Sequence, residues 1–229
     1  MNALVQQECL LLGSEEAIEE LENKESARLL VLADSHGEYK LVESIIKEFG
    51  PECDAVLFCG DGNEEFAACV ENAFYDEDLK AALPPVLATV RGNCDEEAYF
   101  IRKEDEENVA SVPMQLSERQ IFKVANRNVF MVHGHRHGVD LGIETLSAAA
   151  SALDADMIFF GHTHRPFRCE NEATLMLNPG SISRPRGGFA PTFAFVSFPG
   201  EAERYSVEFF TVVEPLFGGY KFELASDIC

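Results

Sequence analysis

All six histidines of this 229-residue chain lie in three short clusters. The clusters are Asp34-Ser35-His36, then His133-Gly134-His135-Arg136-His137, then Gly161-His162-Thr163-His164. Two further segments add oxygen-bearing side chains between them, Gly60-Asp61-Gly62-Asn63 and Gly92-Asn93-Cys94-Asp95. Histidines that served only packing or surface polarity would be scattered along the chain. The clustering therefore predicts a single metal site assembled from distant segments.

The number of candidate ligands indicates two metal ions rather than one. A single ion needs only three or four protein ligands, whereas the chain offers Asp34, His36, Asp61, Asn93, His133, His162 and His164. A carboxylate such as Asp61 can bridge two ions about 3.5–4 Å apart, and such a pair activates water and binds phosphoryl oxygens. We expect extended backbone at Asp34-x-His36 and His162-x-His164. Residues two apart in an extended segment point the same way, so both members of each pair could then reach one metal cluster.

The motifs follow apolar runs that are typical of buried strands. Strands are predicted at 29–33, 55–59, 86–90, 128–132 and 157–160, with helices at 39–49, within 64–83 and at 146–153. Strand–loop–helix units repeated in this way favour a partly parallel sheet with crossover helices. Ligands of such sheets collect at the carboxyl ends of the strands, where these motifs lie.

The remaining segments complete the predicted architecture. The acidic run 103–108 is expected to be a solvated loop, and short strands are expected at 115–116 and 120–124. The tail segments 174–177, 192–197 and 205–213 predict an antiparallel second sheet. The expected fold is α/β, a four-layer αββα sandwich of two stacked mixed β-sheets flanked by helices.

We expect two regions, an N-terminal extension (1–27) and a single domain (28–229). In the extension, Ser14 is a suitable N-cap for a short amphipathic helix with Ile18 and Leu21 on one face. That helix is expected to pack on the surface of the domain.

Composition excludes some partners. With 18 basic and 40 acidic residues the net charge is −22, which argues against a nucleic-acid duplex or an anionic membrane as partner. A phosphate substrate remains compatible, because bound cations can reverse the sign of the local field. The seven cysteines are odd in number and form no C-x-x-C pair, and no signal peptide or spanning segment stands out, so a cytoplasmic location is expected.

The ordered motifs resemble the calcineurin-like metallophosphoesterase superfamily, and more narrowly its subgroup of small YfcE-type phosphodiesterases. The resemblance rests on Asp34-x-His36, Gly60-Asp61, Gly92-Asn93-Cys94-Asp95, His133-Gly134-His135 and Gly161-His162-Thr163-His164. Asn178-Pro179-Gly180-Ser181 matches a loop common in the subgroup. The match covers roughly residues 28–213, and its strength lies in five motifs in order rather than in any one of them.

The resemblance implies which ligands bind each of the two ions. Asp34, His36, Asp61 and His164 would hold one divalent ion, and Asp61, Asn93, His133 and His162 the other. Mn²⁺ is the expected metal, with Fe, Zn²⁺, Co²⁺ or Ni²⁺ as alternatives, since availability in the cell decides between them. A metal-bridging hydroxide would attack phosphorus.

Other residues are candidates for catalysis and substrate binding. The catalytic set is Asn93, Asp95 and His135, and the substrate-binding set is Arg91, Asn93 and His135. Asp95 could orient a metal ligand, or equally cap the following helix. Arg91, Arg136 and Arg165 adjoin the motifs and could bind phosphate, or pair with acidic residues.

One position departs from the superfamily pattern. Many members carry a histidine, thought to protonate the leaving group, where this chain has Cys94. Cys94 is a poor replacement for that histidine. Either His135 supplies the proton instead, or good leaving groups are favoured.

The expected activity is a phosphodiesterase acting on a small phosphodiester. The alternatives are a phosphomonoesterase or nucleotide phosphatase, and a non-catalytic protein-binding scaffold of the same fold. The complete ligand set favours catalysis. Homo-oligomer formation is left open.

Overall fold

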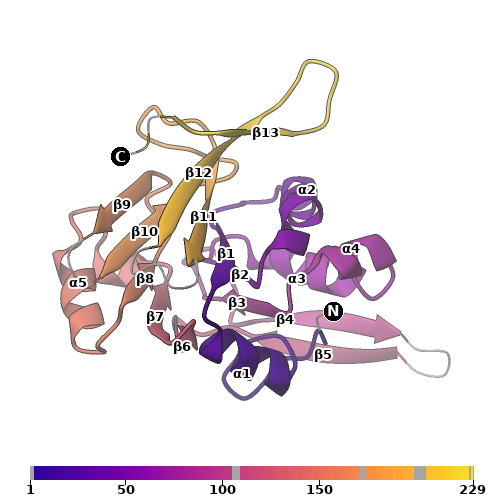
Figure 1. Cartoon of the computed structure of the whole chain (residues 1–229). Coiled ribbons are helices and arrows are strands. Elements are labelled where there is room, and N and C mark those ends of the chain that lie inside the picture. Colours follow the sequence, from indigo (N-terminus) through magenta and orange to yellow (C-terminus); the bar gives the residue numbers. More distant parts are fainter. Residues whose placement is uncertain (1–2, 105–108, 171–173, 199–204, 227, 229) are drawn as a thin grey trace.

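The computed structural model describes residues 3–104, 109–170, 174–198, 205–226 and 228. Two β-sheets stack face to face, and helices cover both outer faces (Figure 1). This four-layer αββα sandwich confirms the predicted α/β fold. Within the described ranges, no helix is long and apolar enough to span a membrane.

The first sheet is mixed. Its strands lie in the order β13 (Lys221–Leu224), β12 (Ser206–Val213), β11 (Thr192–Phe198), β1 (Ala27–Leu32), β2 (Ala55–Phe58) and β3 (Val86–Thr89). The strands β1, β2 and β3 are parallel, and the other pairs are antiparallel. The three predicted parallel strands are thus confirmed, with ends shifted by a residue or two. Their carboxyl ends lie at one edge of the sheet, which is where the first three motifs begin.

The second sheet is also mixed. Its strands lie in the order β6 (Arg119–Val124), β7 (Arg127–Val132), β8 (Met157–Phe159), β10 (Leu175–Pro179) and β9 (Pro166–Glu170). The central strands β7, β8 and β10 are parallel, so the carboxyl ends of β7 and β8 carry the last two histidine clusters to the same side.

The tail strands do not form the predicted separate sheet, although β11 and β12 pair antiparallel as expected. Strand β10 joins the second sheet, parallel to β8, whereas β11 and β12 extend the first sheet beyond β1. Strand β11 is buried on both faces, with Phe193 and Phe195 facing the helices and Ala194 and Val196 facing the second sheet. Alternation along a strand shows which residues share a face, but not which sheet the strand enters.

Three layers of apolar side chains hold the four layers together. Along β1, Leu30 and Leu32 pack against the helices of the first sheet, whereas Leu29 and Val31 pack between the sheets. A third cluster fills the space between the second sheet and its helix, and it includes Phe160. Strands buried on both faces explain the continuous apolar runs of the sequence.

The helices follow the sequence closely. They are α2 (Tyr39–Phe49), followed by the 3-10 turn η1 (Gly50–Glu52), then α3 (Asn63–Asn72), α4 (Glu77–Ala82) and α5 (Glu144–Ser151). Helix α2 matches its predicted range, and α5 begins two residues earlier than predicted. Figure 1 shows α2, α3 and α4 on one side of the sandwich and α5 on the other.

A two-stranded hairpin of β4 (Ala98–Glu104) and β5 (Val109–Gln115) projects from the body (Figure 1). This hairpin is absent from the elements that the sequence predicts. The predicted loop at 103–108 is wrong for Lys103 and Glu104, which belong to β4, and residues 105–108 lie outside the described part. The predicted strand at 115–116 is the end of β5. Charged residues interrupt the apolar–polar alternation of this segment, so the sequence does not indicate that the two strands pair.

The N-terminal segment packs along one edge of the sandwich. Helix α1 (Glu15–Asn23) is capped by Ser14, whose Oγ accepts a hydrogen bond from the Ala17 amide at 3.1 Å. Leu21 is buried between the sheets. Ahead of the helix, Leu12 forms a backbone bridge to Leu87 of β3.

Candidate metal centre

Loops at the carboxyl ends of four strands bring acidic and imidazole groups together. Among the described residues, three groups have ligand atoms within 4.8 Å of one another, namely Asp34, His36 and His164, then Asp34, Asp61 and His133, then His36, Asp61 and Cys94. These loops follow β1, β2, β7 and β8, and the loop after β3 adds Cys94. Segments up to 130 residues apart in sequence, from Asp34 to His164, therefore share one small volume.

The nitrogens and oxygens of this cluster point at one another. Nε2 of His164 lies 3.3 Å from Oδ1 of Asp34 and 3.0 Å from Nε2 of His36. Nε2 of His133 lies 3.4 Å from Oδ2 of Asp61. Oδ2 of Asp61 also lies 4.0 Å from Nε2 of His36, so the Asp61 carboxylate stands between two imidazoles.

Two buried atoms of the cluster, Oδ1 of Asp34 and Nε2 of His133, have no hydrogen-bond partner among the described residues. Leaving such atoms unpaired is costly. The other ring nitrogen of His133 donates to the Cys59 carbonyl at 2.7 Å, and that of His164 donates to the Arg184 carbonyl at 2.6 Å. A carbonyl only accepts, so in the neutral rings Nε2 presents a bare lone pair to the cluster. Facing lone pairs and an orphaned carboxylate oxygen fit a divalent cation.

The charges of the metal-free cluster shift the pKa of its members. Burial opposes the imidazolium of His133, but the Asp61 and Asp34 carboxylates outweigh it and raise the pKa of His133 to about 9. Although burial acts the other way, His133 and the Cys94 amide hold the pKa of Asp61 well below its usual range. Burial lowers the pKa of His36. In the absence of a metal, a proton on His133 offsets part of the carboxylate charge.

Left-handed backbone aims the side chains. Positive φ angles occur at five of the predicted ligands: Asp34 (56°), His36 (43°), Asp61 (55°), His162 (69°) and His164 (57°). The predicted extended backbone at the two x-spaced pairs is therefore wrong. Asp34 and His36 still reach one group, whereas His162 and His164 diverge. Strained conformations of this kind persist where the surroundings hold them, as at functional sites.

The loop Asn178-Pro179-Gly180-Ser181 forms hydrogen bonds to the loops that carry the candidate ligands. Its Asn178 amide donates to the Gly161 carbonyl at 2.7 Å, and Ser181 Oγ donates to the Asp34 carbonyl at 2.7 Å. Ser183 donates to the same Asp34 carbonyl at 3.1 Å. These bonds tie the loop that carries Asp34 to the loop that carries His162.

Asp95 is a clamp on the Asp61 loop. Its carboxylate accepts hydrogen bonds from the backbone amides of Asp61, Gly62, Asn63 and Gly92, and from the Asn63 side chain. These bonds occupy both carboxylate oxygens, and the side chain is buried. The prediction that placed Asp95 among the catalytic residues is not supported by this geometry. Asp95 instead accepts from the first amides of α3, which precedes it in the chain, and so positions Asp61. The predicted cap of a following helix is wrong, because strand β4 follows Asp95.

Close packing fixes the same loop at Gly92. A Cβ on Gly92 would lie 2.1 Å from Oδ1 of Asp61 and 2.5 Å from the Asp61 amide nitrogen. Glycine is therefore required where the loop after β3 crosses the loop after β2.

Two predicted ligands point away from the cluster. The Asn93 side chain is exposed, and its amide nitrogen donates to Sγ of Cys94 at 3.3 Å. Nε2 of His162 lies 2.7 Å from Oδ2 of Asp140, although its ring remains 5.1 Å from that of His133, centroid to centroid. Both residues border the centre, and both need a rotation to join it.

The predicted substrate-binding residues have mixed surroundings. His135, in the 3-10 turn η2 (His135–His137), is half-buried, and its Nε2 lies 3.7 Å from Glu118. Burial, together with the charge of His133, lowers the pKa of His135. Arg91 and Arg136 both pair with Glu118, at 3.7 and 2.8 Å. For these two arginines the alternative of pairing with acidic residues holds.

Sequence reasoning missed Arg184. Its guanidinium donates to the His36 carbonyl at 3.1 Å, and it lines a cavity of about 360 Å³ together with His36, Asp61 and Cys94. It lies three residues beyond the Asn178-Pro179-Gly180-Ser181 loop, outside the motifs that the sequence indicates. The arginine therefore supplies a positive charge at the mouth of the cluster.

Known proteins are similar to this chain in sequence. Residues 28–200 match the calcineurin-like phosphoesterase superfamily domain. The probable metallophosphoesterase YsnB of Bacillus subtilis is 28% identical over 174 residues, which cover 76% of this chain and 86% of that protein. Phosphodiesterase YfcE of Escherichia coli is 28% identical over 167 residues, covering 70% and 82%.

Solved structures show the same fold. A predicted phosphoesterase from Streptococcus pneumoniae aligns with a TM-score of 0.59 at 24% identity, covering 87% of this chain and 98% of that one. Vacuolar protein sorting 29 from Cryptosporidium parvum aligns with a TM-score of 0.60 at 18% identity, covering 87% and 97%.

Proposed function

Because the chain belongs to the calcineurin-like phosphoesterase superfamily, we propose that it is a phosphodiesterase that uses two divalent metal ions. The observation that carries the proposal is the position of Asp61. Its Oδ2 lies 3.4 Å from Nε2 of His133 and 4.0 Å from Nε2 of His36. A carboxylate between two imidazoles is the arrangement expected of a bridging ligand.

The proposed ligand sets follow the family pattern. Asp34, His36, Asp61 and His164 would hold the first ion, and Asp61, Asn93, His133 and His162 the second. The buried, unpartnered Oδ1 of Asp34 supports the first set, and the unpartnered Nε2 of His133 supports the second. We propose Mn²⁺ as the metal, with Fe, Zn²⁺, Co²⁺ or Ni²⁺ as alternatives that the same donors accept.

Bound divalent ions would supply a nucleophile by lowering the pKa of water, and would offset the charge of the phosphoryl group. The chain's own groups bind and orient the substrate. Arg184 borders the cavity over the cluster and can donate to a phosphoryl oxygen. On the side of the second ion, the ring of His135 lies 5.4 Å from that of His133, and Asn93 contacts Cys94, which lines the cavity.

Neither His135 nor Cys94 is a good proton donor for the leaving group. The lowered pKa of His135 leaves its imidazole mostly neutral near pH 7, so we propose that it donates a hydrogen bond rather than a proton. The Cys94 thiol is no better, because burial and the Asp61 carboxylate raise its pKa to about 11. We therefore propose that esters with good leaving groups are preferred.

A diester substrate is favoured over a monoester by the relatives. The Escherichia coli relative is a phosphodiesterase, and the chain covers 82% of it. We also propose that residues 28–229 form the catalytic domain, with residues 1–27 as an extension packed on it, and that the protein works in the cytoplasm. The six described cysteines are free thiols, which suits a reducing compartment.

Parallel hydrolysis of bis-p-nitrophenyl phosphate and p-nitrophenyl phosphate tests the proposal. The protein is stripped with EDTA and then reloaded with Mn²⁺. Restored cleavage of the diester, with little cleavage of the monoester, is the expected result. Cleavage of the monoester alone would identify a phosphomonoesterase. If protein shown to hold two ions cleaved neither ester, a protein-binding scaffold would be the better account.

A further inference from the structure

A cavity of about 550 Å³ lies beside the metal centre and has no role in the function proposed above. Its floor is apolar, and includes Val139, Phe160 and Phe167. The rings of Phe160 and Phe167 lie 5.9 Å apart at 61°, an edge-on aromatic pair at the end of the second sheet. Such a floor suits a planar or apolar group of a ligand.

Two arginines, Arg165 and Arg186, line one wall of this cavity. Their side chains have no ion pair or hydrogen bond with any residue that the structure describes, whereas Arg91, Arg136 and Arg168 all pair with carboxylates. The Arg165 side chain lies against Gly187, where a Cβ would approach its Nε to 3.1 Å, so the two arginines come from adjacent backbone. In a chain with 40 acidic and 18 basic residues, two unpaired arginines at one cavity indicate an anion site.

Two acidic residues, Asp140 and Glu144, also line the cavity. Asp140 faces His162, with Oδ2 at 2.7 Å from Nε2, and is thereby partly occupied. Glu144 folds toward Gly142, where a Cβ would lie 2.2 Å from its Oε2. Arg165 and Arg186 are therefore the positively charged side chains of the cavity lining.

The cavity and the metal centre share a wall. Thr163 lines the cavity, and it stands between His162 and His164. The amide of Arg186 donates to the His164 carbonyl at 3.0 Å. A substrate with its phosphorus over the centre can thus reach the cavity across the 162–164 loop.

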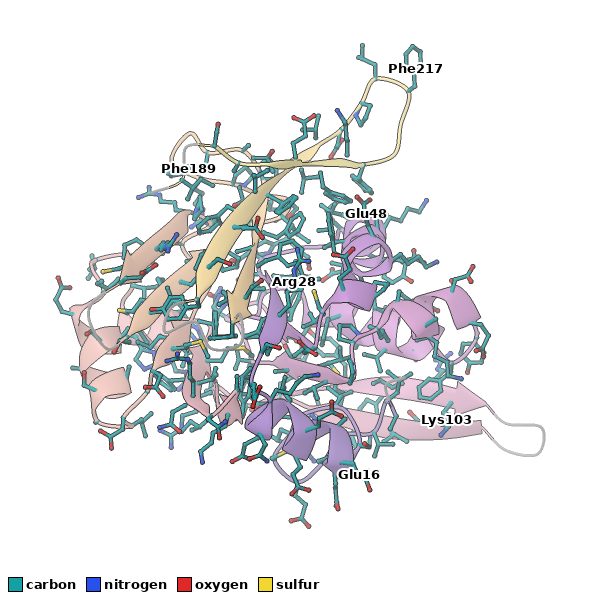
Figure 2. All side chains as sticks on the ribbon, in the orientation of Figure 1. Glu16, Arg28, Glu48, Lys103, Phe189 and Phe217 are labelled. Atoms are coloured by element: carbon teal, nitrogen blue, oxygen red, sulfur yellow. The ribbon has the colours of Figure 1, made fainter. Side chains whose placement is uncertain are left out.

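An exposed aromatic ring completes the cavity rim. Phe189 is 41% exposed and lines the same cavity. Figure 2 shows it on the side of the molecule that holds β9 and β10, away from Lys103 on the β4–β5 hairpin. A ring in this position can cover a planar group that enters the cavity.

We propose that this cavity binds the second ester arm of the substrate, an aromatic or apolar group that ends in a further phosphate. The apolar floor and Phe189 take the group itself, and Arg165 and Arg186 take the terminal phosphate, which carries a charge of about −2. The proposal rests on the phosphodiesterase function, and it narrows the substrate to diesters with a terminal phosphate on one arm.

Two chromogenic esters test it. Thymidine 3′-(p-nitrophenyl phosphate) is compared with the same ester bearing a 5′-phosphate, using Mn²⁺-loaded protein. We expect kcat/KM to be about ten-fold higher for the 5′-phosphorylated ester, the effect of one charge-assisted phosphate contact. The double variant Arg165→Gln/Arg186→Gln should lose that preference, so that it cleaves the two esters with equal kcat/KM. The matched control Arg168→Gln removes an arginine paired with Glu170 and should keep the preference.

A binding measurement separates this proposal from the proposed function. Calorimetry compares thymidine 3′,5′-bisphosphate with thymidine 3′-monophosphate on the full-length protein, and needs no turnover. Tighter binding of the bisphosphate, lost in the double variant, would support the cavity even if no ester were cleaved. Equal binding of both, or equal loss of both in a folded double variant, would overturn the proposal whatever the activity.

Discussion

Nε2 of His133 faces the carboxylate of Asp61, 3.4 Å from Oδ2, and both side chains are buried. The Cys59 carbonyl accepts a hydrogen bond from Nδ1 of the same ring, which fixes its orientation. A lone pair facing a carboxylate oxygen is repulsive unless a cation or a proton lies between them. This contact therefore makes the protein sensitive to both metal and pH.

Metal should stabilise the folded protein, because the bound ions have no equivalent site in the unfolded chain. At an Mn²⁺ concentration about 100-fold above the dissociation constant, we expect the melting temperature to rise by about 5–10 °C. Differential scanning calorimetry with Mn²⁺ and with EDTA measures it. Coincident melting curves would show that the site is not preformed.

The metal-free protein should lose stability as the pH rises from 6.5 to 9. The folded pKa of His133, about 9, exceeds its ordinary value of 6.5, so its contribution to stability is complete below pH 6.5 and is lost as the pH rises through 9. The pKa of Asp61 is lowered from 3.8, so its contribution is present above that pH. Melting temperatures in EDTA across this range measure the loss.

The variant His133→Gln provides the control for this pH dependence. It cannot titrate, so its melting temperature in EDTA should be flatter between pH 6.5 and 9 than that of the parent protein. An equally steep fall in the variant would assign the effect to another group.

Loss of the Asp95 clamp should weaken folding more than loss of an ordinary surface charge. The substitution Asp95→Ala leaves four backbone amides and the Asn63 side chain without their acceptor. We expect the free energy of unfolding in EDTA to fall by about 3 kcal/mol. Urea denaturation measures it, with the exposed neighbour Glu96→Ala as a control that should change by less than about 0.5 kcal/mol. Equal effects of the two substitutions would show that the hydrogen bonds of Asp95 do not stabilise the fold.

The Cys94 thiol should react slowly with iodoacetamide in metal-free protein near neutral pH. Burial and the Asp61 carboxylate raise its pKa to about 11, so little thiolate is present below pH 9. Mass spectrometry after timed alkylation follows the site, with exposed Cys169 as an internal reference. Rapid alkylation of Cys94 at pH 7 would show that its surroundings favour the thiolate instead.

The sequence predicted the sandwich and most of the cluster because both depend on local signals. Apolar runs such as 29–33 and 55–59 mark buried strands, and the residues that follow them, such as Asp34 and Asp61, must gather where parallel strands end. The position of the centre within the fold therefore follows from the order of these segments in the sequence.

Other features depend on contacts that sequence order does not carry. Strand β11 pairs with β1, where Ala194 lies opposite Val31, 163 residues earlier in the chain. Alternation alone does not identify that partner. The left-handed backbone at Asp34 and His36 is visible only in three dimensions. The same is true of Asp95, whose partners lie in the loop after β2, and of Arg184, which reaches His36 across the site.

The most direct test of the two-metal claim is the metal content of Asp61→Asn beside that of the parent protein, determined by mass spectrometry of the dialysed Mn²⁺-loaded samples. We predict two ions per chain in the parent and fewer than one in the variant, with cleavage of bis-p-nitrophenyl phosphate lost in parallel. The exposed control Asp78→Asn on α4 should retain both ions. Two ions and full turnover in Asp61→Asn would contradict the account.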